Sequence, residues 1–459
     1  MSLKIYNYLS RKVEEFRPIS ETVGMYTCGP TVYDYVHIGN WRTFVFEDLL
    51  KRVLIFNSYK VKHVMNITDI DDKIIKASSE ARIAFSEITQ KYEKAFFEDL
   101  EKLNILKADV YPRATEHITP MIRLIGVLLK KGIAYRAEDG VYFAVAKFKD
   151  YGKLSQLEKR QLKIGARISE DLYDKENWSD FALWKFPQRN TSKVGSDSFE
   201  VNRIEPSWDA PFDRGRPGWH IECSSMSMKY LGGTFDIHCG GVDLLFPHHE
   251  NEIAQSEAAT GKKFVNFWLE GEHLLVEGEK MAKSLGNIFT LSDLAKRGVE
   301  PLTLRYLFLT AHYRSKLNFT WKSLEAAQNA LNNLRDQIAA WDEPKVGCAG
   351  FEYDFREAIN NDLDMPKAVA VMWEMAKSSY PTSAKRQSIL VMDKVLGLGL
   401  DEIKKQVLPK RAEELIEKRE ELRRAGKFGE SDKIRKQLAQ MGVLVEDTAN
   451  GPKWKIRNK

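Results

Sequence analysis

Hydrophobic and polar positions follow two different periods in the first part of the chain. Residues 23–28 and 59–64 are apolar runs typical of buried strands. Between them, residues 42–54 carry apolar side chains at helical spacing, after a turn at Gly29-Pro30. Strand, turn, helix and strand within about 40 residues indicate a βαβ unit, and therefore a parallel sheet that binds ligands at the carboxyl ends of its strands.

The pattern changes between residues 113 and 205. A helix is predicted at 117–131 and a strand at 140–145, followed by polar segments. The stretch 188–200 is rich in Ser, Asn, Lys and Gly, so we expect a mobile loop there. The α/β pattern resumes with a strand at 235–238. Residues 113–205 are therefore interpreted as an inserted domain.

After residue 300 the spacing of apolar residues is helical for about a hundred residues, which predicts a helical bundle. The terminal segment predicts two helices and a short strand pair. The expected helices lie at 302–309, 324–340, 355–361 and 367–376, then at 412–425 and 430–441 around a loop at 426–429, with strands at 443–445 and 454–456.

We therefore expect an α/β protein in which a Rossmann-type parallel-sheet catalytic domain contains an insertion and is followed by a helical bundle and a small α/β module. The expected boundaries are 1–112 and 206–260 for the two halves of the sheet domain, 113–205 for the insertion, 261–310 for a segment with a basic loop, 311–405 for the bundle and 406–459 for the terminal module.

Composition excludes several classes of protein. Hydrophobic residues make up 43% and charged residues 29%, which is typical of a globular chain and not of a disordered or fibrous one. Four scattered cysteines indicate a reducing compartment, and no signal peptide or membrane-spanning run is recognised. We expect a cytoplasmic protein with no membrane partner. The surplus positive charge lies in residues 406–459, where a nucleic-acid contact and a solvated helical face both remain open.

Residues 247–252 combine two imidazoles with two carboxylates. If Pro247 opens a helix, His248 and Glu252 stand four residues apart on one face and can converge on a metal ion. Zinc normally takes four ligands, so two more are needed, preferably cysteines. A zinc hydrolase, with Glu250 or Glu252 as general base beside His248 and His249, is an alternative.

Two further segments fit phosphate chemistry. His-Ile-Gly-Asn at residues 37–40 lies between the first strand and the first helix, where backbone amides and a glycine permit close approach of an anion. Lys-Met-Ala-Lys-Ser at residues 280–284 places two lysines in a loop that can neutralise a polyphosphate. Alone, each is better explained as an ordinary loop.

Together these two segments resemble the signature motifs of class I aminoacyl-tRNA synthetases, and nearly the whole chain resembles the cysteinyl-tRNA synthetases. The first motif ends in Asn40 and the loop contains Ala282, where that family usually has histidine and serine; these departures concern efficiency more than the reaction. Other matching runs lie at residues 26–34, 66–73, 215–223, 246–252 and 312–315.

The resemblance implies ligation of L-cysteine to tRNA(Cys) through cysteinyl-adenylate, with one zinc ion selecting the substrate thiolate. Serine differs from cysteine by oxygen for sulfur, and a neutral hydroxyl is a poor zinc ligand. The implied zinc ligands are Cys28, Cys223, His248 and Glu252, and the implied amino-acid pocket is Gly29, Thr68 and Trp219.

The resemblance also implies which residues handle ATP, accompanied by Mg²⁺. The implied catalytic residues are His37, Asn40, Lys280 and Lys283, and the implied ATP-binding residues are His37, Gly39, Asn40, Asp243, Lys283 and Ser284.

The terminal module is expected to bind tRNA through aromatic and charged side chains. We expect a monomer. A cysteine:amino-sugar ligase with the same adenylate chemistry and a catalytically silent RNA-binding relative are the remaining alternatives. The candidate tRNA contacts are Arg424, Lys427, Phe428, Asp447 and Trp454.

Overall fold

The computed structural model describes residues 2–156, 162–168, 178–187, 206–403, 408–448 and 451–456. Within these, four parallel strands form the central sheet, in the order β11–β10–β3–β4. Strands β3 and β10 are neighbours although the inserted region separates them in sequence. The strands are β3 (Thr22–Thr27), β4 (Lys60–Met65), β10 (Phe235–Gly241) and β11 (Val265–Gly271). The predicted parallel sheet is confirmed.

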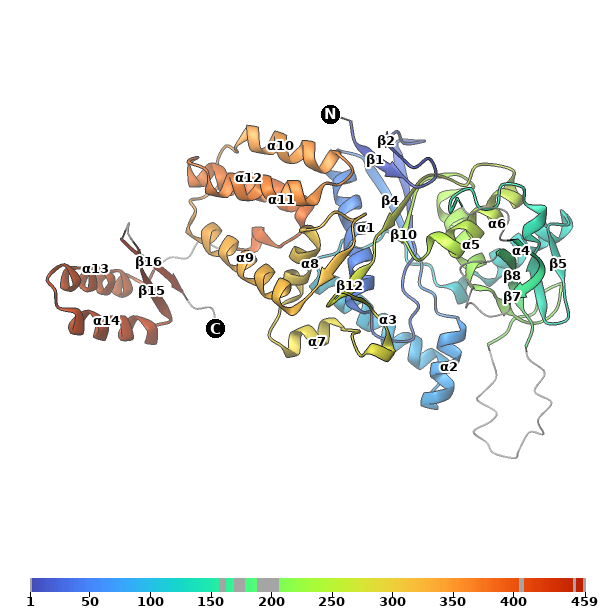
Figure 1. The fold of residues 1–459 in the computed structure, drawn as a ribbon, viewed down its shortest axis with the longest axis horizontal. Coiled ribbons are helices and arrows are strands. Elements are labelled where there is room, and N and C mark those ends of the chain that lie inside the picture. The colour runs from blue at the N-terminus through green and yellow to red at the C-terminus, as the bar shows by residue number, and fades with distance from the viewer. Residues whose placement is uncertain are drawn as a thin grey trace. The chain divides into compact units, whose positions relative to one another are not determined.

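Helix α1 (Ile38–Phe56) connects β3 to β4 and packs along β4, β10 and β11 (Figure 1). It begins four residues before the predicted start, because the side chain of His37 accepts a hydrogen bond from the backbone N–H of Asn40 and caps the first turn. Apolar spacing alone did not reveal this cap. Its buried residues include Glu47, Asp48 and Arg52, so α1 is enclosed on several faces.

The inserted region forms a second sheet, in the order β5–β6–β8–β7 with β9 on β8. The predicted strand and helix of this region are confirmed as β6 and α4, and the predicted loop at 188–200 lies outside the described residues. The elements are α4 (Ile118–Lys130), β5 (Ala134–Arg136), β6 (Gly140–Phe143), β7 (Leu162–Ile168), β8 (Trp178–Lys185) and β9 (Arg216–Pro217).

Helices α5 and α6 pack against α4, and α5 also contacts β3 and β4. One apolar core therefore joins the parallel sheet, at Tyr26 and Trp268, to the inserted region, at Leu124 and Phe181. Other elements of this part are β1 (Lys4–Asn7), β2 (Lys12–Glu15), α2 (Asp72–Ala81), α3 (Phe85–Lys102), α5 (Trp219–Leu231) and α6 (Glu250–Thr260).

A three-stranded sheet, in the order β13–β12–β14, is formed by strands on both sides of residue 300. Strands β12 and β13 come before helices α7 and α8 in the sequence, and β14 comes after them. All four helices predicted there are confirmed, and α12 was not predicted. The elements are β12 (Leu274–Val276), β13 (Glu279–Lys280), α7 (Leu291–Lys296), α8 (Pro301–Leu309), β14 (Leu317–Phe319), α9 (Trp321–Ala340), α10 (Ala349–Asn360), α11 (Met365–Lys377) and α12 (Thr382–Leu396).

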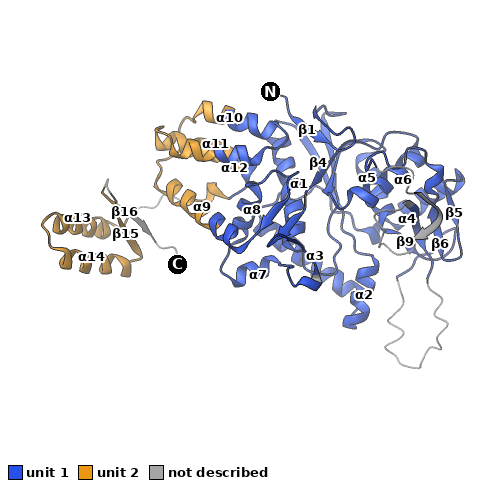
Figure 2. Cartoon of the chain, in the orientation of Figure 1, with its two compact units in different colours: residues 1–327, 354–370, 394–398 blue, residues 328–353, 371–393, 399–459 orange. Residues whose placement is uncertain are grey.

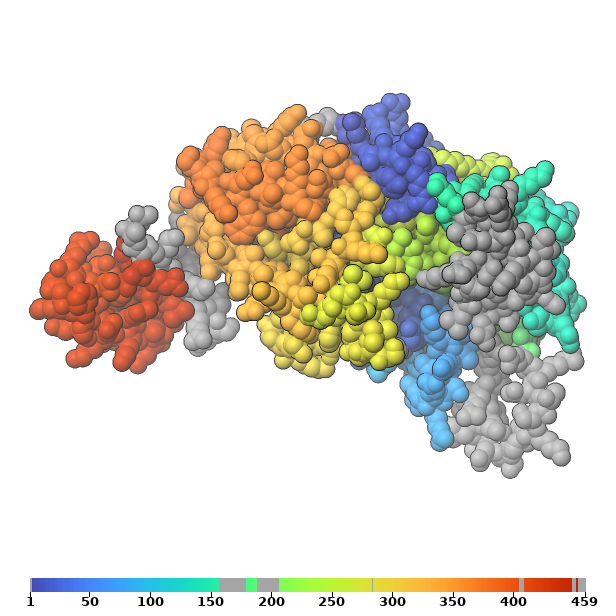
Figure 3. Space-filling view, in the orientation of Figure 1, coloured from blue at the N-terminus to red at the C-terminus, as the bar shows by residue number. Residues whose placement is uncertain are grey.

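The terminal module consists of two helices and an antiparallel hairpin, as predicted. The module, red in Figure 3, has a small core of its own that includes Ile416, Leu438 and Val443. Phe428 opens α14, so it does not lie in the loop where the sequence placed it. The elements are α13 (Lys410–Arg424), α14 (Phe428–Gln440), β15 (Val443–Thr448) and β16 (Gly451–Ile456).

The chain divides into two compact units (Figure 2). The larger contains the central parallel sheet and the sheet of the inserted region, and the smaller contains most of the helical segment and the terminal module. Across the described residues, none of the helices has the length and apolarity needed to cross a bilayer. The larger unit comprises residues 1–327, 354–370 and 394–398, and the smaller comprises 328–353, 371–393 and 399–459.

Candidate functional site

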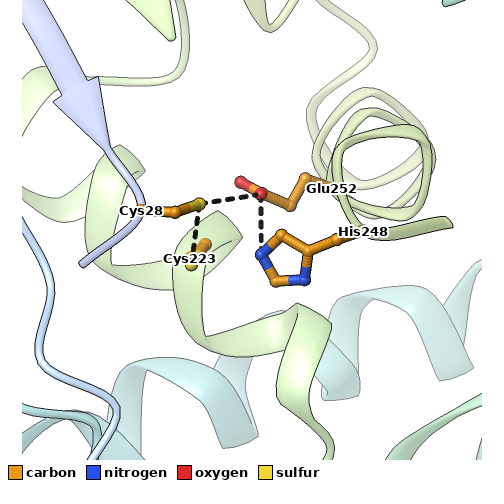
Figure 4. Close-up of side chains that lie close together, drawn as sticks. All are labelled: Cys28, Cys223, His248 and Glu252. Carbon is orange, nitrogen blue, oxygen red and sulfur yellow. Dashed lines mark hydrogen bonds and ion pairs between the residues drawn. The ribbon is translucent and has the colours of Figure 1, made fainter. Parts of the chain in front are cut away.

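Four buried side chains converge at the carboxyl edge of the parallel sheet (Figure 4). Cys28 follows β3, Cys223 lies in α5, His248 precedes α6 and Glu252 lies in its first turn. Their potential ligand atoms all lie within 4.8 Å of one another. Cys28 Sγ is 3.9 Å from both Cys223 Sγ and Glu252 Oε1, and His248 Nε2 is 3.1 Å from Glu252 Oε1.

The helical backbone that leads into α6 starts at Pro247, as the sequence suggested. Phe246 has extended backbone angles, with φ −138° and ψ 131°, inside the irregular turn Leu245–His249, and α6 itself begins at Glu250. His248 and Glu252 therefore keep the four-residue spacing on one face and meet.

The charges of the cluster are strongly coupled. Burial raises the pKa of the Cys28 thiol well above its ordinary value. Burial also opposes ionisation of Cys223, but the hydrogen bond from Cys28 and the positive charge of His248 outweigh it and lower the pKa of Cys223 to about 6. Conversely, Cys223 and Glu252 overcome burial and raise the pKa of His248 to about 10. Such a thiolate and carboxylate are suited to a cation.

The cluster fits zinc on two observations. Two thiols, one imidazole and one carboxylate form a four-member set of the donor types that zinc prefers. His248 Nδ1 lies 2.8 Å from His220 Nδ1, whereas His248 Nε2 is buried and faces the cluster, 3.1 Å from Glu252 Oε1. The nitrogen that faces the cluster is therefore available as a ligand.

Additional titratable side chains surround this set. His249 Nε2 lies 3.6 Å from Cys28 Sγ, and its Nδ1 lies 2.7 Å from Glu270 Oε1. His238 Nε2 lies 3.0 Å from Glu252 Oε2. The sequence did not single out His238, His220 or Glu270. The only sequence signal for His238 was its place near the end of the predicted strand 235–238, at the edge where ligands bind.

The hydrogen-bond donors to Glu250 lie in the inserted region. The carboxylate of Glu250 accepts hydrogen bonds from the backbone N–H groups of Gly152, Leu154 and Ser155, so it holds the inserted region against α6. This arrangement leaves Glu250 without contact to the four-member cluster, which disfavours it as the general base of a hydrolase.

The three predicted amino-acid pocket residues lie beside the cluster. The backbone N–H of Gly29 donates to Asn66 Oδ1 at 3.0 Å, and Thr68 Oγ1 donates to Glu222 Oε2 at 3.1 Å. The ring of Trp219 lies against that of His248, with centroids 4.2 Å apart. Burial, followed by the charge of Cys223, raises the pKa of Glu222 well above its usual range. Sequence reasoning missed Asn66 and Glu222.

The two phosphate-type motifs also come together. A Cβ atom added at Gly39 would lie 2.1 Å from the Cε atom of Met281, so the loop that follows β13 packs directly on the first turn of α1. Because His37 Nδ1 accepts the capping hydrogen bond, a neutral His37 ring carries its proton on Nε2 and can donate it to an anion. Asn40 presents its amide side chain in the same first turn.

An open cleft of about 390 Å³ lies next to this contact, between the ends of β10 and β11 and the basic loop. Asp243, Glu272, Lys280 and Lys316 line it with both charge signs. Ser284 is exposed in the loop, and the side chain of Lys283 lies outside the described residues. Asn287 fixes the loop, because its side chain accepts from Ala282 N and donates to Lys280 O.

The tRNA candidates of the terminal module have different surroundings. Arg424, Lys427 and Phe428 are exposed, and Phe428 retains 59% of its accessible surface. The carboxylate of Asp447 accepts two hydrogen bonds from the buried Arg419, at 2.8 and 2.9 Å, so it braces the module from within. The side chain of Trp454 lies outside the described residues.

Comparison with known proteins agrees with this geometry. Residues 15–329 match the family model of the class I (C) tRNA synthetase catalytic domain. A methionyl-tRNA synthetase of Mycobacterium tuberculosis in complex with methionyl-adenylate has the same fold, with a TM-score of 0.57 and 14% identity over 84% of this chain and 92% of its own. A LeuRS-tRNA-LeuAMS complex from Agrobacterium radiobacter K84 gives 0.59 and 10%, over 84% and 85%. The fold and site define a class I aminoacyl-tRNA synthetase.

The particular family follows from the full length. Residues 405–454 match the cysteinyl-tRNA ligase anticodon binding domain. Curated cysteine–tRNA ligases from Chlamydia felis and Brachyspira hyodysenteriae are 46% and 43% identical, covering 99% and 98% of this chain and 98% of each relative. The chain belongs to the cysteine–tRNA ligase family.

Proposed function

We propose that this protein joins L-cysteine to tRNA(Cys) at the expense of ATP, and that Cys28, Cys223, His248 and Glu252 hold a zinc ion that selects the substrate. The observation that carries the proposal is the convergence of these four buried side chains beside a nucleotide-sized cleft at the carboxyl edge of a parallel sheet.

Bound zinc would supply preferential affinity for a thiolate over a hydroxyl. The chain's own contribution is orientation, because His220 fixes the ring of His248 and His238 contacts the second carboxylate oxygen of Glu252. A hydrophobic pocket would distinguish such near-isosteric substrates by only about a hundredfold.

In the first step, a carboxylate oxygen of cysteine attacks the α-phosphorus of ATP, the bond to the bridging oxygen breaks, and pyrophosphate leaves with the electron pair. We assign phosphate contacts to His37 Nε2 and to the amide of Asn40, and neutralisation of the leaving group to Lys280 and Lys283. Magnesium would accompany ATP. Asp243, in the cleft, is assigned to the ribose.

In the second step, a terminal ribose hydroxyl of the tRNA attacks the carbonyl carbon, and AMP leaves. The terminal module, with Arg424, Lys427 and Phe428 exposed, is assigned to the tRNA. Trp454 remains a candidate on the same module. A cysteine:amino-sugar ligase would have no use for an anticodon-binding domain, whose family model this chain matches.

Cysteine-dependent exchange of labelled pyrophosphate into ATP tests the proposal. Exchange is expected with zinc-loaded protein and cysteine, and not with serine, while release of AMP from the adenylate requires tRNA(Cys). Absence of exchange from protein shown to contain zinc would contradict the assigned activity. Release of AMP by an amino-sugar in place of tRNA would favour the alternative ligase.

A further inference from the structure

Glu222 precedes the candidate ligand Cys223 in α5, and its carboxylate is enclosed by protein, with 1% of the residue exposed. One oxygen, Oε2, accepts the hydrogen bond from Thr68. The other, Oε1, is buried and has no hydrogen-bond partner in the part of the chain that the structure describes. A buried acceptor left in this way is costly, so its retention points to a donor that arrives with a ligand.

A chain of hydrogen bonds fixes the direction in which Thr68 acts. Gly29 N donates to Asn66 Oδ1 at 3.0 Å, Asn66 Nδ2 donates to Thr68 Oγ1 at 3.1 Å, and Thr68 Oγ1 donates to Glu222. The single hydroxyl hydrogen of Thr68 is thus committed to Glu222. Its oxygen has a second lone pair, so towards any further group Thr68 can act only as an acceptor.

The position of this chain indicates the chemistry of the donor. Asn66 Oδ1 lies 3.7 Å from Cys223 Sγ, so the chain borders the cluster proposed to hold the substrate sulfur. In cysteine the ammonium nitrogen is only three bonds from that sulfur. The ammonium group is the charged hydrogen-bond donor that cysteine would bring to this place, and a charged donor binds an acceptor more strongly than a neutral one.

We propose that Glu222 and Thr68 form an acceptor pair for the α-ammonium group of the substrate: Glu222 Oε2 holds Thr68 as an acceptor, and Glu222 Oε1 is the second acceptor, which makes the site specific for thiols that carry this group. This rests on the proposed function of the cluster. The consequence is that cysteine is accepted, whereas N-acylated cysteines and thiols without an amine are rejected by loss of a charge-assisted hydrogen bond.

The experiment uses two thiols that each lack one group of cysteine, namely cysteamine, which has no carboxylate, and β-mercaptopropionate, which has no amine. Their binding to zinc-loaded protein is measured by calorimetry for the wild type, Glu222→Gln and Thr68→Val. Both variants should weaken cysteamine about ten- to a hundredfold, the value of a hydrogen bond to a charged group. β-Mercaptopropionate should change less than about twofold, because it makes no contact that Thr68 orients.

Glu47→Gln is the matched control, because Glu47 is another buried carboxylate, in α1, and is not assigned to the pocket. It should leave the preference between the two thiols unchanged. Equal weakening of both thiols by Glu222→Gln and Thr68→Val, or no change in either, would overturn the inference. Pyrophosphate exchange by the wild type is measured in a separate experiment. If exchange fails while the preference between the two thiols is retained, the proposed activity is wrong and this inference about thiol binding still stands.

Discussion

The two ring nitrogens of His248 have different surroundings, and this difference determines what the side chain can do. Nδ1 is engaged by His220, and Nε2 faces Cys223 and Glu252. The sequence predicted that His248 and Glu252 would meet, because residues four apart share a helix face. Spacing alone could not predict His220 or Cys28 as their neighbours, because proximity across 28 and 224 residues depends on the packing of elements. The resemblance to the cysteinyl-tRNA synthetases implied Cys28 as a ligand, but not the contact with His220.

The candidate ligands give the first prediction. Cys28→Ser and His248→Ala should each lose most of the bound zinc and raise the KM for cysteine at least tenfold, because each removes one of four donors. The KM for ATP should change less than about threefold, because none of the four candidate ligands lines the cleft that we assign to ATP. Elemental analysis and exchange kinetics on the same preparations provide the measurements.

Cys239→Ala is the control for this prediction, since Cys239 is fully buried in β10 and is absent from the groups of candidate ligands. It should retain one zinc ion per chain. Equal losses in cysteine and ATP recognition by Cys28→Ser would mean that the cluster only maintains the fold.

Buried His63 gives a pH prediction. Burial, and then the charge of Lys51, lowers the pKa of His63 to about 3 in the folded state, against an ordinary 6.5. Below pH 6.5 His63 binds a proton in the unfolded chain but not in the folded chain, so the free energy of unfolding falls as pH falls. His63→Gln has no group at this position that takes up a proton on unfolding. The difference in free energy of unfolding between the wild type and His63→Gln should therefore become about 2 kcal/mol smaller at pH 5 than at pH 7, as measured by urea unfolding.

Thr27→Val is the comparison for His63, because Thr27 Oγ1 lies 2.9 Å from His63 Nε2 and does not titrate in this range. Its effect on stability should be the same at both pH values. An unchanged effect of His63→Gln at the two pH values would show that His63 accepts a proton without unfolding the surrounding core.

At the scale of elements, α1 connects the parts of the cleft that we assign to ATP. Its Arg42 donates from Nη1 to the backbone carbonyls of Glu272 and His273, and from Nη2 to those of His312 and Ser315. Glu272 and His273 line the cleft, and Ser315 adjoins Lys316, which also lines it. One guanidinium thus fixes two walls of the cleft relative to the first turn of α1.

Arg42→Lys retains the positive charge but loses the planar fork that reaches four carbonyls. We expect the KM for ATP in pyrophosphate exchange to rise about tenfold or more, with zinc content and cysteine affinity nearly unchanged. The exposed Arg82→Lys in α2's carboxyl cap offers the same exchange without such contacts and should be neutral. A normal KM for ATP in Arg42→Lys would show that the walls are held by other contacts.

Periodicity predicted most elements that lie in regular surroundings, such as β3, β4, α8 and α9. It failed where polar side chains replace apolar ones inside the protein. The start of α1 depends on the cap at His37, and the turn before α6 depends on the irregular backbone at Phe246. Glu222 and Glu47 are buried on helices, and spacing cannot distinguish such carboxylates from solvated ones.

At the scale of the whole chain, the terminal module has a core distinct from that of the catalytic part. Buried Arg419 and its partner Asp447 join α13 to the hairpin inside this module. The spacing of apolar residues in the last segment predicted two helices and a strand pair, and these are the elements of the module. The pairing of Arg419 with Asp447 could not be predicted, because α14 lies between them in the sequence.

Removal of residues 404–459 should therefore separate the two steps of the reaction. Cysteine-dependent pyrophosphate exchange should stay within about twofold of the wild type, because the truncation removes no residue assigned to that step. Aminoacylation of tRNA(Cys) should fall at least tenfold in kcat/KM. Loss of exchange in a truncated protein that remains folded and zinc-loaded would show that the module supports the catalytic part directly.

The separation of Cys28 from Glu252 by 224 residues has a consequence for biosynthesis. At translation rates of about 5 to 20 residues per second, roughly ten to forty-five seconds pass between the synthesis of the first candidate ligand and that of the last. During this interval the thiol of Cys28 is present on the growing chain without the full set of the other candidate ligands. If the cluster holds the proposed zinc ion, all four ligands become available only after both halves of the catalytic fold have been made and joined.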